Sequence, residues 1–344
     1  MPEGDAVRRL ADTFDHVFCG YACEVTSPQG RFAASAARIN GMVLVGARAV
    51  GKHMFLGFAP PELAVPTVSE YARAVRPTQP IDGVVHWVHI HLGLYGWWRF
   101  NGDSSIDDAG HGVVRRNVSR VGPKDRHRPM KWGGGAMNDD DVPIDEAEAG
   151  HPWQVPEPVG QVRLRLVAPH AVADLAGPTR CELVSDEQRC VVEAKLGPDP
   201  LWPGARDDAE AMACFVVAVR KTKRVIGELL MDQSILAGVG NIYRADALFL
   251  AGISPMRQGQ RVSRTRLEDL WRIVCDLMNR GFEAGYLITM DPLEAPDPPI
   301  EGDEEASRWY VYHRTGRPCL RCNTPIAEKV LQGRRLFWCP SCQR

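Results

Sequence analysis

Four cysteines near the end of the 344-residue chain form two Cys-x-x-Cys pairs, and this spacing strongly restricts what the segment around them can fold into. The pairs are Cys319 with Cys322 and Cys339 with Cys342, and sixteen residues separate them. Two such knuckles at this separation bind one tetrahedral Zn²⁺ through four thiolates, which leaves no open coordination position. We therefore predict a small C-terminal module built around one structural zinc ion.

The residues between the two knuckles, 330–338, have the pattern of a β-hairpin. Arg334 and Arg335 lie near its predicted tip, where a guanidinium group can reach a phosphate. The alternative is that these arginines are ordinary surface charge.

The composition predicts a globular protein of the cytoplasm. Hydrophobic residues make up 44% of the chain, but no run approaches the roughly 18–20 apolar residues that span a membrane. The first residues carry charges such as Asp5 and Arg8, so we expect no secretory signal. The other six cysteines are therefore expected to be reduced thiols. Nothing in the sequence favours an oligomer, so we expect a monomer.

The net charge of −2 conceals an uneven distribution. The stretch 103–157 carries 11 acidic and 7 basic residues, and 291–305 carries 7 acidic residues and no basic one. The rest of the chain holds 34 basic and 25 acidic residues, a net of +9. A basic body of this kind favours a phosphate-bearing partner such as a nucleic acid. The basic run 115–131 is either an additional DNA-contacting arm or part of a self-neutralising insert.

Hydrophobic periodicity predicts four segments in an α+β chain. Residues 1–185 combine a helix over 5–18 with short alternating runs, typical of antiparallel sheets packed as a sandwich, and include a flexible insert at 102–160. Residues 186–288 have helical periodicity. An acidic, proline-rich and flexible linker follows at 289–306, and the cysteine module occupies 307–344.

A glycine turn at Gly238-Val239-Gly240 interrupts the helical segment. We predict that a preceding helix ends before it and that Asn241 caps the next helix. A glycine turn at a helix N-terminus exposes unpaired N–H groups and so favours an anion, to which the Asn241 amide can also donate. The alternative is an ordinary tight turn between two helices.

The chain begins Met1-Pro2-Glu3. If Met1 is removed, Pro2 presents a secondary amine that can form an iminium with a sugar carbon, and a fraction of such amines is unprotonated near neutral pH. The Glu3 carboxyl can transfer protons at the same carbon. The alternative is that Pro2 belongs to a disordered end.

Several motifs occur together in one order: Met1-Pro2-Glu3-Gly4, Gly51-Lys52, the run 91–96 (HLGLYG), the glycine turn with Asn241, and the terminal cysteine module. In this combination the chain resembles the formamidopyrimidine-DNA glycosylase/endonuclease VIII family, and it looks most like an endonuclease VIII-type member. The resemblance covers nearly the whole chain apart from 103–157 and 291–305. It implies an N-terminal two-layer β-sandwich, a helix–two-turn–helix domain and a C-terminal four-cysteine zinc finger.

The resemblance also implies a function in base-excision repair on damaged double-stranded DNA. Such enzymes are bifunctional glycosylases and AP lyases that excise an oxidised base and cleave the strand by β,δ-elimination. In this sequence, the family's catalytic roles correspond to Pro2 as the Schiff-base nucleophile, Glu3 as the acid/base and Lys52 as a phosphate-contacting catalytic lysine. The DNA-binding roles correspond to the phosphate clamps Asn241 and Arg334 and the gap-filling residues Leu94 and Tyr95.

Three alternatives stay open. Leu94 and Tyr95 are either gap-filling residues or core residues at a strand end. The Pro2-Glu3-Gly4 start and the Leu94-Tyr95 pair favour oxidised pyrimidines over 8-oxoguanine, and a formamidopyrimidine/8-oxoguanine glycosylase is the second reading. A catalytically silent protein that binds DNA lesions is the third. Gly93 stands where some endonuclease VIII enzymes carry a polar residue, so the sequence does not indicate how the opposite base is read.

Overall fold

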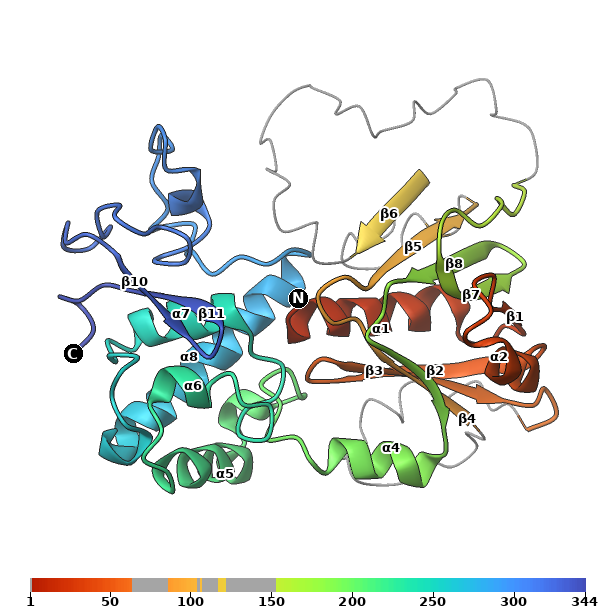
Figure 1. The fold of residues 1–344 in the computed structure, drawn as a ribbon, viewed down its shortest axis with the longest axis horizontal. Helices are drawn as coiled ribbons and strands as arrows, with labels where there is room; N and C mark the ends of the chain where they lie inside the picture. The colour runs from red at the N-terminus through yellow and green to blue at the C-terminus, as the bar shows by residue number, and fades with distance from the viewer. Residues whose placement is uncertain (1, 64–85, 104–105, 107–116, 122–152) are drawn as a thin grey trace.

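The computed structural model describes residues 2–63, 86–103, 106, 117–121 and 153–344, and confirms the predicted fold class. Two lobes lie side by side in Figure 1, a β-rich lobe formed by the first half of the chain and a helical lobe that carries the C-terminal hairpin. The N-terminus lies where the two lobes meet. Within the described ranges, no helix is long and apolar enough to cross a membrane.

Two antiparallel sheets form the β-rich lobe. The five-stranded sheet has the order β1-β7-β8-β5-β6, and the four-stranded sheet has the order β2-β3-β4-β9. The strands of the first sheet are β1 (Glu24–Thr26), β5 (Trp97–Gly102), β6 (Asn117–Val121), β7 (Val162–Ala168) and β8 (Ala171–Ala176). Those of the second are β2 (Val43–Val50), β3 (His53–Ala59), β4 (His86–His91) and β9 (Arg180–Val184).

Helix α1 (Gly4–Phe18) supplies much of the core that the two sheets share. Its apolar residues recur at helical spacing, and Leu10 and Phe14 are fully buried. Phe14 packs edge-on against Trp98 of β5, with ring centroids 4.7 Å apart. A second helix of this half, α2, spans Ala33–Ile39. Burial of this apolar stripe fixes the direction of α1 and therefore the position of the residues that precede it.

The insert predicted at 102–160 is in part a regular element. β6 pairs with β5 as the edge strand of the five-stranded sheet, which the weak periodicity of this stretch did not indicate. Most of the basic run 115–131 lies outside the described residues.

A second core holds the helical lobe together, with the Trp271 side chain fully buried in it. Helix α4 (Asp186–Glu193), which packs on the four-stranded sheet, begins with a capping box between Ser185 and Gln188. The helices that follow are α5 (Ala209–Arg220), α6 (Ile226–Leu229), α7 (Asn241–Leu250) and α8 (Arg264–Glu283), with single 3-10 turns at Ala205–Asp207 and Gly259–Arg261.

The C-terminal module contains the predicted hairpin, β10 (Ala327–Leu331) with β11 (Arg334–Trp338). Gln332 and Gly333 form its two-residue turn, both with positive φ, as expected for a tight hairpin. It packs on α7 in a separate small core.

The acidic stretch expected to be a flexible linker is anchored by specific contacts. Asp303 forms an ion pair with the fully buried Arg314 (2.9 Å), and Glu294 pairs with Arg321 (3.0 Å). Residues Glu304–Ser307 form a 3-10 turn. Two acidic side chains of this stretch therefore attach it to the C-terminal module.

Candidate active site and nucleic-acid interface

Three segments distant in sequence converge where the two lobes meet: the N-terminus, the β2–β3 turn and the glycine turn before α7. The Gly4 N–H donates to the Gly238 carbonyl (2.9 Å). A Cβ atom on Gly4 would lie 2.9 Å from the Gly238 Cα, and one on Gly51 would lie 3.1 Å from the Gly238 nitrogen. Glycine at all three positions lets the backbones approach this closely, and this places Pro2, Glu3 and Lys52 at one junction.

The Glu3 carboxylate occupies the N-terminus of α7. Its two oxygens accept hydrogen bonds from the backbone N–H groups of Gly240 (2.8 Å) and Ile242 (2.9 Å). These donors have no partner inside the helix, and the helix dipole favours negative charge there. Glu3 is 1% exposed, so the two hydrogen bonds fix its position without help from solvent. Pro2, the residue before it, is also buried.

Two expectations about the glycine turn are therefore wrong in detail. Gly240, not Asn241, is the N-cap of α7, and Asn241 is the first residue within the helix. The N–H groups expected to receive a phosphate are occupied by Glu3. Sequence spacing alone did not reveal that the chain supplies this anion itself.

Asn241 instead connects the helical lobe to the C-terminal hairpin. Its side-chain amide donates to the Arg335 carbonyl (2.8 Å), while its side-chain oxygen accepts from Arg244. Arg244 also donates to the Gly227 carbonyl (3.0 Å). This arrangement ties the start of α7 to β11, the strand that begins with Arg334.

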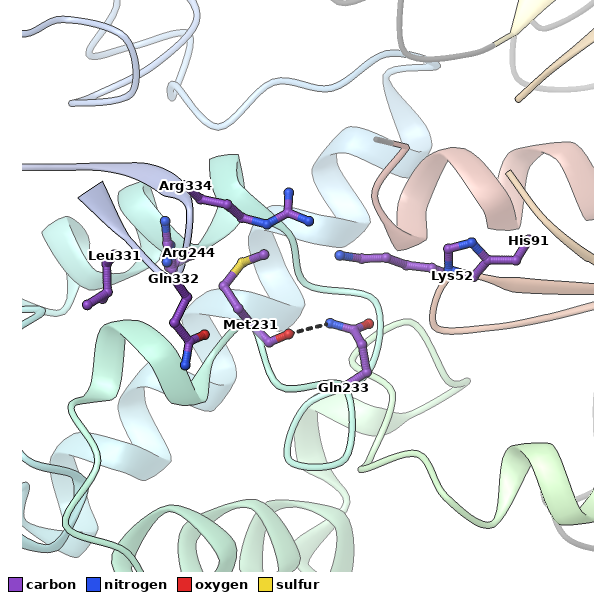
Figure 2. A pocket seen from close by; sticks show the side chains of 8 residues that line it. All are labelled: Lys52, His91, Met231, Gln233, Arg244, Leu331, Gln332 and Arg334. Atoms are coloured by element: carbon purple, nitrogen blue, oxygen red, sulfur yellow. Dashed lines mark hydrogen bonds between the residues drawn. The ribbon is translucent and has the colours of Figure 1, made fainter. Parts of the chain in front are cut away.

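A cavity of about 230 Å³ opens at the junction (Figure 2). Lys52, Arg244 and Arg334 line it together with His91, and none of the described residues that line it carries a carboxylate. The Lys52 and Arg334 side chains extend toward each other from opposite lobes. Burial, and then the neighbouring Arg334, lowers the pKa of Arg244 to about 10, so this guanidinium stays charged near neutral pH. The cavity is therefore suited to an anion.

His91 and Arg244 were missed as site residues by sequence reasoning. His91 is the last residue of β4. This strand pairs with β3, which begins directly after Lys52. Burial, followed by Lys52 and Arg180, lowers the pKa of His91. A histidine at the head of the run 91–96 was the only available signal.

Gln233 shapes the turn that supports the cavity. Its amide nitrogen donates to the carbonyls of Met231 (3.1 Å) and Val239 (3.0 Å), and its oxygen accepts from the Gly238 N–H (2.9 Å). The side chains of Gln233 and Met231 form part of the cavity wall.

Leu94 and Tyr95 lie in the loop between β4 and β5 and are exposed. Leu94 is 52% and Tyr95 78% accessible, so the alternative that they are core residues is wrong. Gly93 has φ of +67°, and the Thr179 side chain fills the space that a Cβ atom there would need. The loop thus presents two apolar side chains in sequence, with none at position 93.

The four cysteines form a structural zinc site. Their sulfur atoms lie within 4.8 Å of one another, and those of Cys322 and Cys339 are 3.4 Å apart. Cys319 and Cys339 are fully buried, as expected for ligands that organise a small core. Four thiolates in this arrangement match the tetrahedral ligand set of structural Zn²⁺.

Asp246 attaches this zinc module to α7. Its buried carboxylate accepts from the backbone N–H groups of Tyr310 (2.9 Å), Val311 (3.0 Å) and Tyr312 (3.3 Å), and from the Thr289 hydroxyl. The position of Arg334 relative to the cavity therefore depends on both the metal and this contact.

Comparisons with known proteins are consistent with this geometry. Residues 196–291 match the formamidopyrimidine-DNA glycosylase H2TH domain. Over 343 residues the chain is 35% identical to Endonuclease 8 1 of Mycobacterium tuberculosis, with 100% of both chains covered. It is 37% identical over 155 residues to formamidopyrimidine-DNA glycosylase of Geobacillus kaustophilus, which covers 44% of this chain and 52% of that one. The fold is similar to that of Lactococcus lactis formamidopyrimidine-DNA glycosylase bound to DNA with an abasic site (TM-score 0.63, 17% identity, 99% of both chains).

Proposed function

Because the chain belongs to the formamidopyrimidine-DNA glycosylase/endonuclease VIII family of DNA glycosylases and AP lyases, we propose that Pro2 and Glu3 carry its chemistry. After removal of Met1, the Pro2 amine attacks C1′ of the damaged nucleotide, the bond from C1′ to the base breaks, and the base leaves with a proton. Glu3 protonates the ring oxygen as the sugar opens, which leaves an iminium between Pro2 and C1′.

Strand cleavage follows from the iminium. Loss of a proton from C2′ expels the 3′ phosphate, and a second elimination expels the 5′ phosphate. Water then hydrolyses the remaining iminium, which releases the sugar fragment as an aldehyde and regenerates the Pro2 amine. Lys52 lies close enough to this chemistry to stabilise a phosphate beside the lesion, because Gly51 and Gly4 both pack on the same glycine turn.

The cavity is the proposed phosphate site. Lys52 from the β-rich lobe and Arg334 from the zinc module approach it from opposite sides, and Arg244 adds a third cation. A phosphate between the lobes would lie in the combined positive field of these three side chains. In this arrangement one N–H of the Asn241 amide donates to the Arg335 carbonyl, and its second N–H can donate to a phosphate.

Leu94 and Tyr95 are the proposed gap-filling side chains. A base must leave the duplex stack before its C1′ can be reached, at a cost of a few kcal/mol. Apolar side chains inserted between base steps hold such a state. Solvent exposure of both residues in a glycine-supported loop supports this role.

Oxidised pyrimidines are the proposed substrate class. A relative named Endonuclease 8 1 aligns with the whole chain, whereas the formamidopyrimidine-DNA glycosylase of Geobacillus kaustophilus aligns with 44% of it. This difference favours the endonuclease VIII-type reading over a purine-specific enzyme.

The single observation that carries the proposal is the Glu3 carboxylate held by Gly240 and Ile242 directly after Pro2. The test is borohydride trapping on duplexes with thymine glycol, 8-oxoguanine or an abasic site, using protein shown by mass to begin at Pro2. We expect a covalent adduct with the wild type and none with Pro2→Gly. Absence of a wild-type adduct together with normal affinity for abasic DNA would identify a silent lesion-binding protein. An adduct with 8-oxoguanine but not thymine glycol would reverse the substrate assignment.

A further inference from the structure

Three histidines form a continuous cluster on the outer face of the four-stranded sheet, beside the cavity. His53 begins β3, and His89 and His91 lie two residues apart on β4 and therefore share a face. The His53 ring lies 5.0 Å from the His91 ring, centroid to centroid. His53 Nδ1 and His89 Nε2 are 2.8 Å apart, so these two rings share one hydrogen bond.

The burial of His89 determines the direction of that hydrogen bond. His89 is 1% exposed and stacks on Phe55 at 4.5 Å, and its Nδ1 atom has no hydrogen-bond partner among the described residues. A buried N–H without an acceptor is the more costly arrangement. We therefore assign the proton to His89 Nε2, which donates to His53 Nδ1. The second nitrogen of His53, Nε2, then carries the proton.

This cluster is neutral near physiological pH. Burial, then His91, Arg180 and Lys52, lowers the pKa of His53 to about 4. Burial, then His53, Arg180 and His91, lowers the pKa of His89 to about 3. The only acidic neighbour on the adjoining strand, Glu182, pairs with Arg180 (3.2 Å).

We propose that His53, held in its Nε2–H tautomer by His89, is a neutral hydrogen-bond donor to a DNA phosphate next to the one that Lys52 and Arg334 hold. His53 is partly exposed and packs against His91, which lines the cavity. A DNA strand that enters the cavity would carry its next phosphate past the pair of His91 and His53, which begins at the cavity wall. This inference rests on the proposed function, because it needs DNA in the cavity.

Salt dependence separates a neutral donor from a charged one. A cation that neutralises a phosphate releases a counterion, so its removal lowers the slope of log K against log salt concentration by about 1. Loss of a neutral donor weakens binding equally at every salt concentration. The experiment measures affinity for a duplex with a tetrahydrofuran abasic analogue over a series of NaCl concentrations, and repeats it between pH 6.5 and 8.5.

We expect His53→Phe to weaken binding by about tenfold at all salt concentrations, with an unchanged slope and no pH dependence. His53→Gln, which keeps a neutral donor, should restore most of the affinity. His89→Phe removes the hydrogen-bond donor that selects the tautomer of His53. The DNA affinity of this variant should lie between that of His53→Phe and that of the wild type. Arg334→Ala is the charged control, with a lower slope.

Wild-type affinity in His53→Phe would overturn the inference, as would a lower slope or tighter binding at low pH, which would identify an imidazolium contact. If His53→Phe lowers the melting temperature of the protein, His53→Ala replaces it in the experiment. We then expect the same loss of DNA affinity in His53→Ala and the same restoration of affinity in His53→Gln. Borohydride trapping by the wild type tests the proposed function independently. If the wild type is trapped and His53→Phe binds DNA with unchanged affinity, only the role of His53 is refuted.

Discussion

The Gly240 N–H donates to the Glu3 carboxylate at 2.8 Å, although 237 positions separate the two residues in sequence. A Cβ atom on Gly240 would lie 2.6 Å from Glu3 Oε1 and 2.7 Å from its Cγ. The φ of Gly240 is −122°, which any residue can adopt, so glycine is needed there for space and not for backbone conformation.

Gly240→Ala should therefore displace Glu3 and lower base excision by at least about a hundredfold, the scale of a lost general acid. Excision of thymine glycol under single-turnover conditions measures the effect. Combining it with Glu3→Asp, whose shorter side chain relieves the overlap, should cost less than the sum of the two single changes. Strictly additive losses would show that the two residues do not act through this contact.

Arg334 and Arg335 are adjacent but should differ in effect. Arg334 lines the cavity, whereas Arg335 pairs with Glu328 through a 2.6 Å hydrogen bond at the surface. Arg334→Ala should weaken binding to abasic DNA and reduce its salt slope by about 1, whereas Arg335→Ala should leave both nearly unchanged. Fluorescence anisotropy at several salt concentrations measures both, and equal losses in the two variants would argue against the cavity as the phosphate site.

The double variant Leu94→Ala/Tyr95→Ala should impair activity on duplex DNA but leave the chemical steps intact. Both side chains are exposed, so their removal should change the free energy of unfolding by no more than about 0.5 kcal/mol. Excision from duplex DNA should fall at least about tenfold, while reaction with a single-stranded abasic oligonucleotide, which has no gap to fill, should persist. Leu293→Ala, at a residue 96% exposed in the acidic stretch, is the matched control. A parallel loss on both substrates would contradict the gap-filling role.

Zinc removal should abolish DNA binding without unfolding the β-rich lobe. The metal organises the small core beneath β10 and β11, and the Asn241 contact to Arg335 depends on that hairpin. The wild type should contain one zinc per chain, and Cys339→Ala none. Near-ultraviolet circular dichroism should retain the signal of the buried Trp87 and Trp98 in the variant. Full DNA affinity in zinc-free protein would show that the finger is not needed to place Arg334.

Acid should destabilise the protein through the histidine cluster. The folded pKa of His53, about 4, lies below its unfolded value of 6.5, so on acidification the unfolded chain binds the proton first. The stabilisation is complete above pH 6.5, is lost as the pH falls toward 4, and changes no further below that. At pH 5 the loss for one such group is about 2 kcal/mol. Urea unfolding at pH 7 and pH 5 should show a smaller decrease for His53→Gln than for the wild type, and equal decreases would contradict the burial of a neutral His53.

The sequence determined the features that depend on local spacing. The zinc ligands follow from two knuckles sixteen residues apart, and α1 follows from apolar residues at helical intervals. The order of motifs predicted the family, which the full-length match to a mycobacterial Endonuclease 8 1 confirms. The roles of the individual site residues stay predictions for the experiments above.

Only the tertiary structure decided which groups meet. That Glu3, and not a phosphate, occupies the N-terminus of α7 depends on the packing of α1 against both sheets, which no local pattern encodes. Arg334 and Arg335 look equivalent in sequence, but neighbouring residues of a strand point to opposite faces, and only one of them faces the cavity. The histidine cluster likewise arises because β3 and β4 pair in one register, which brings His53 and His91 together from positions 38 residues apart.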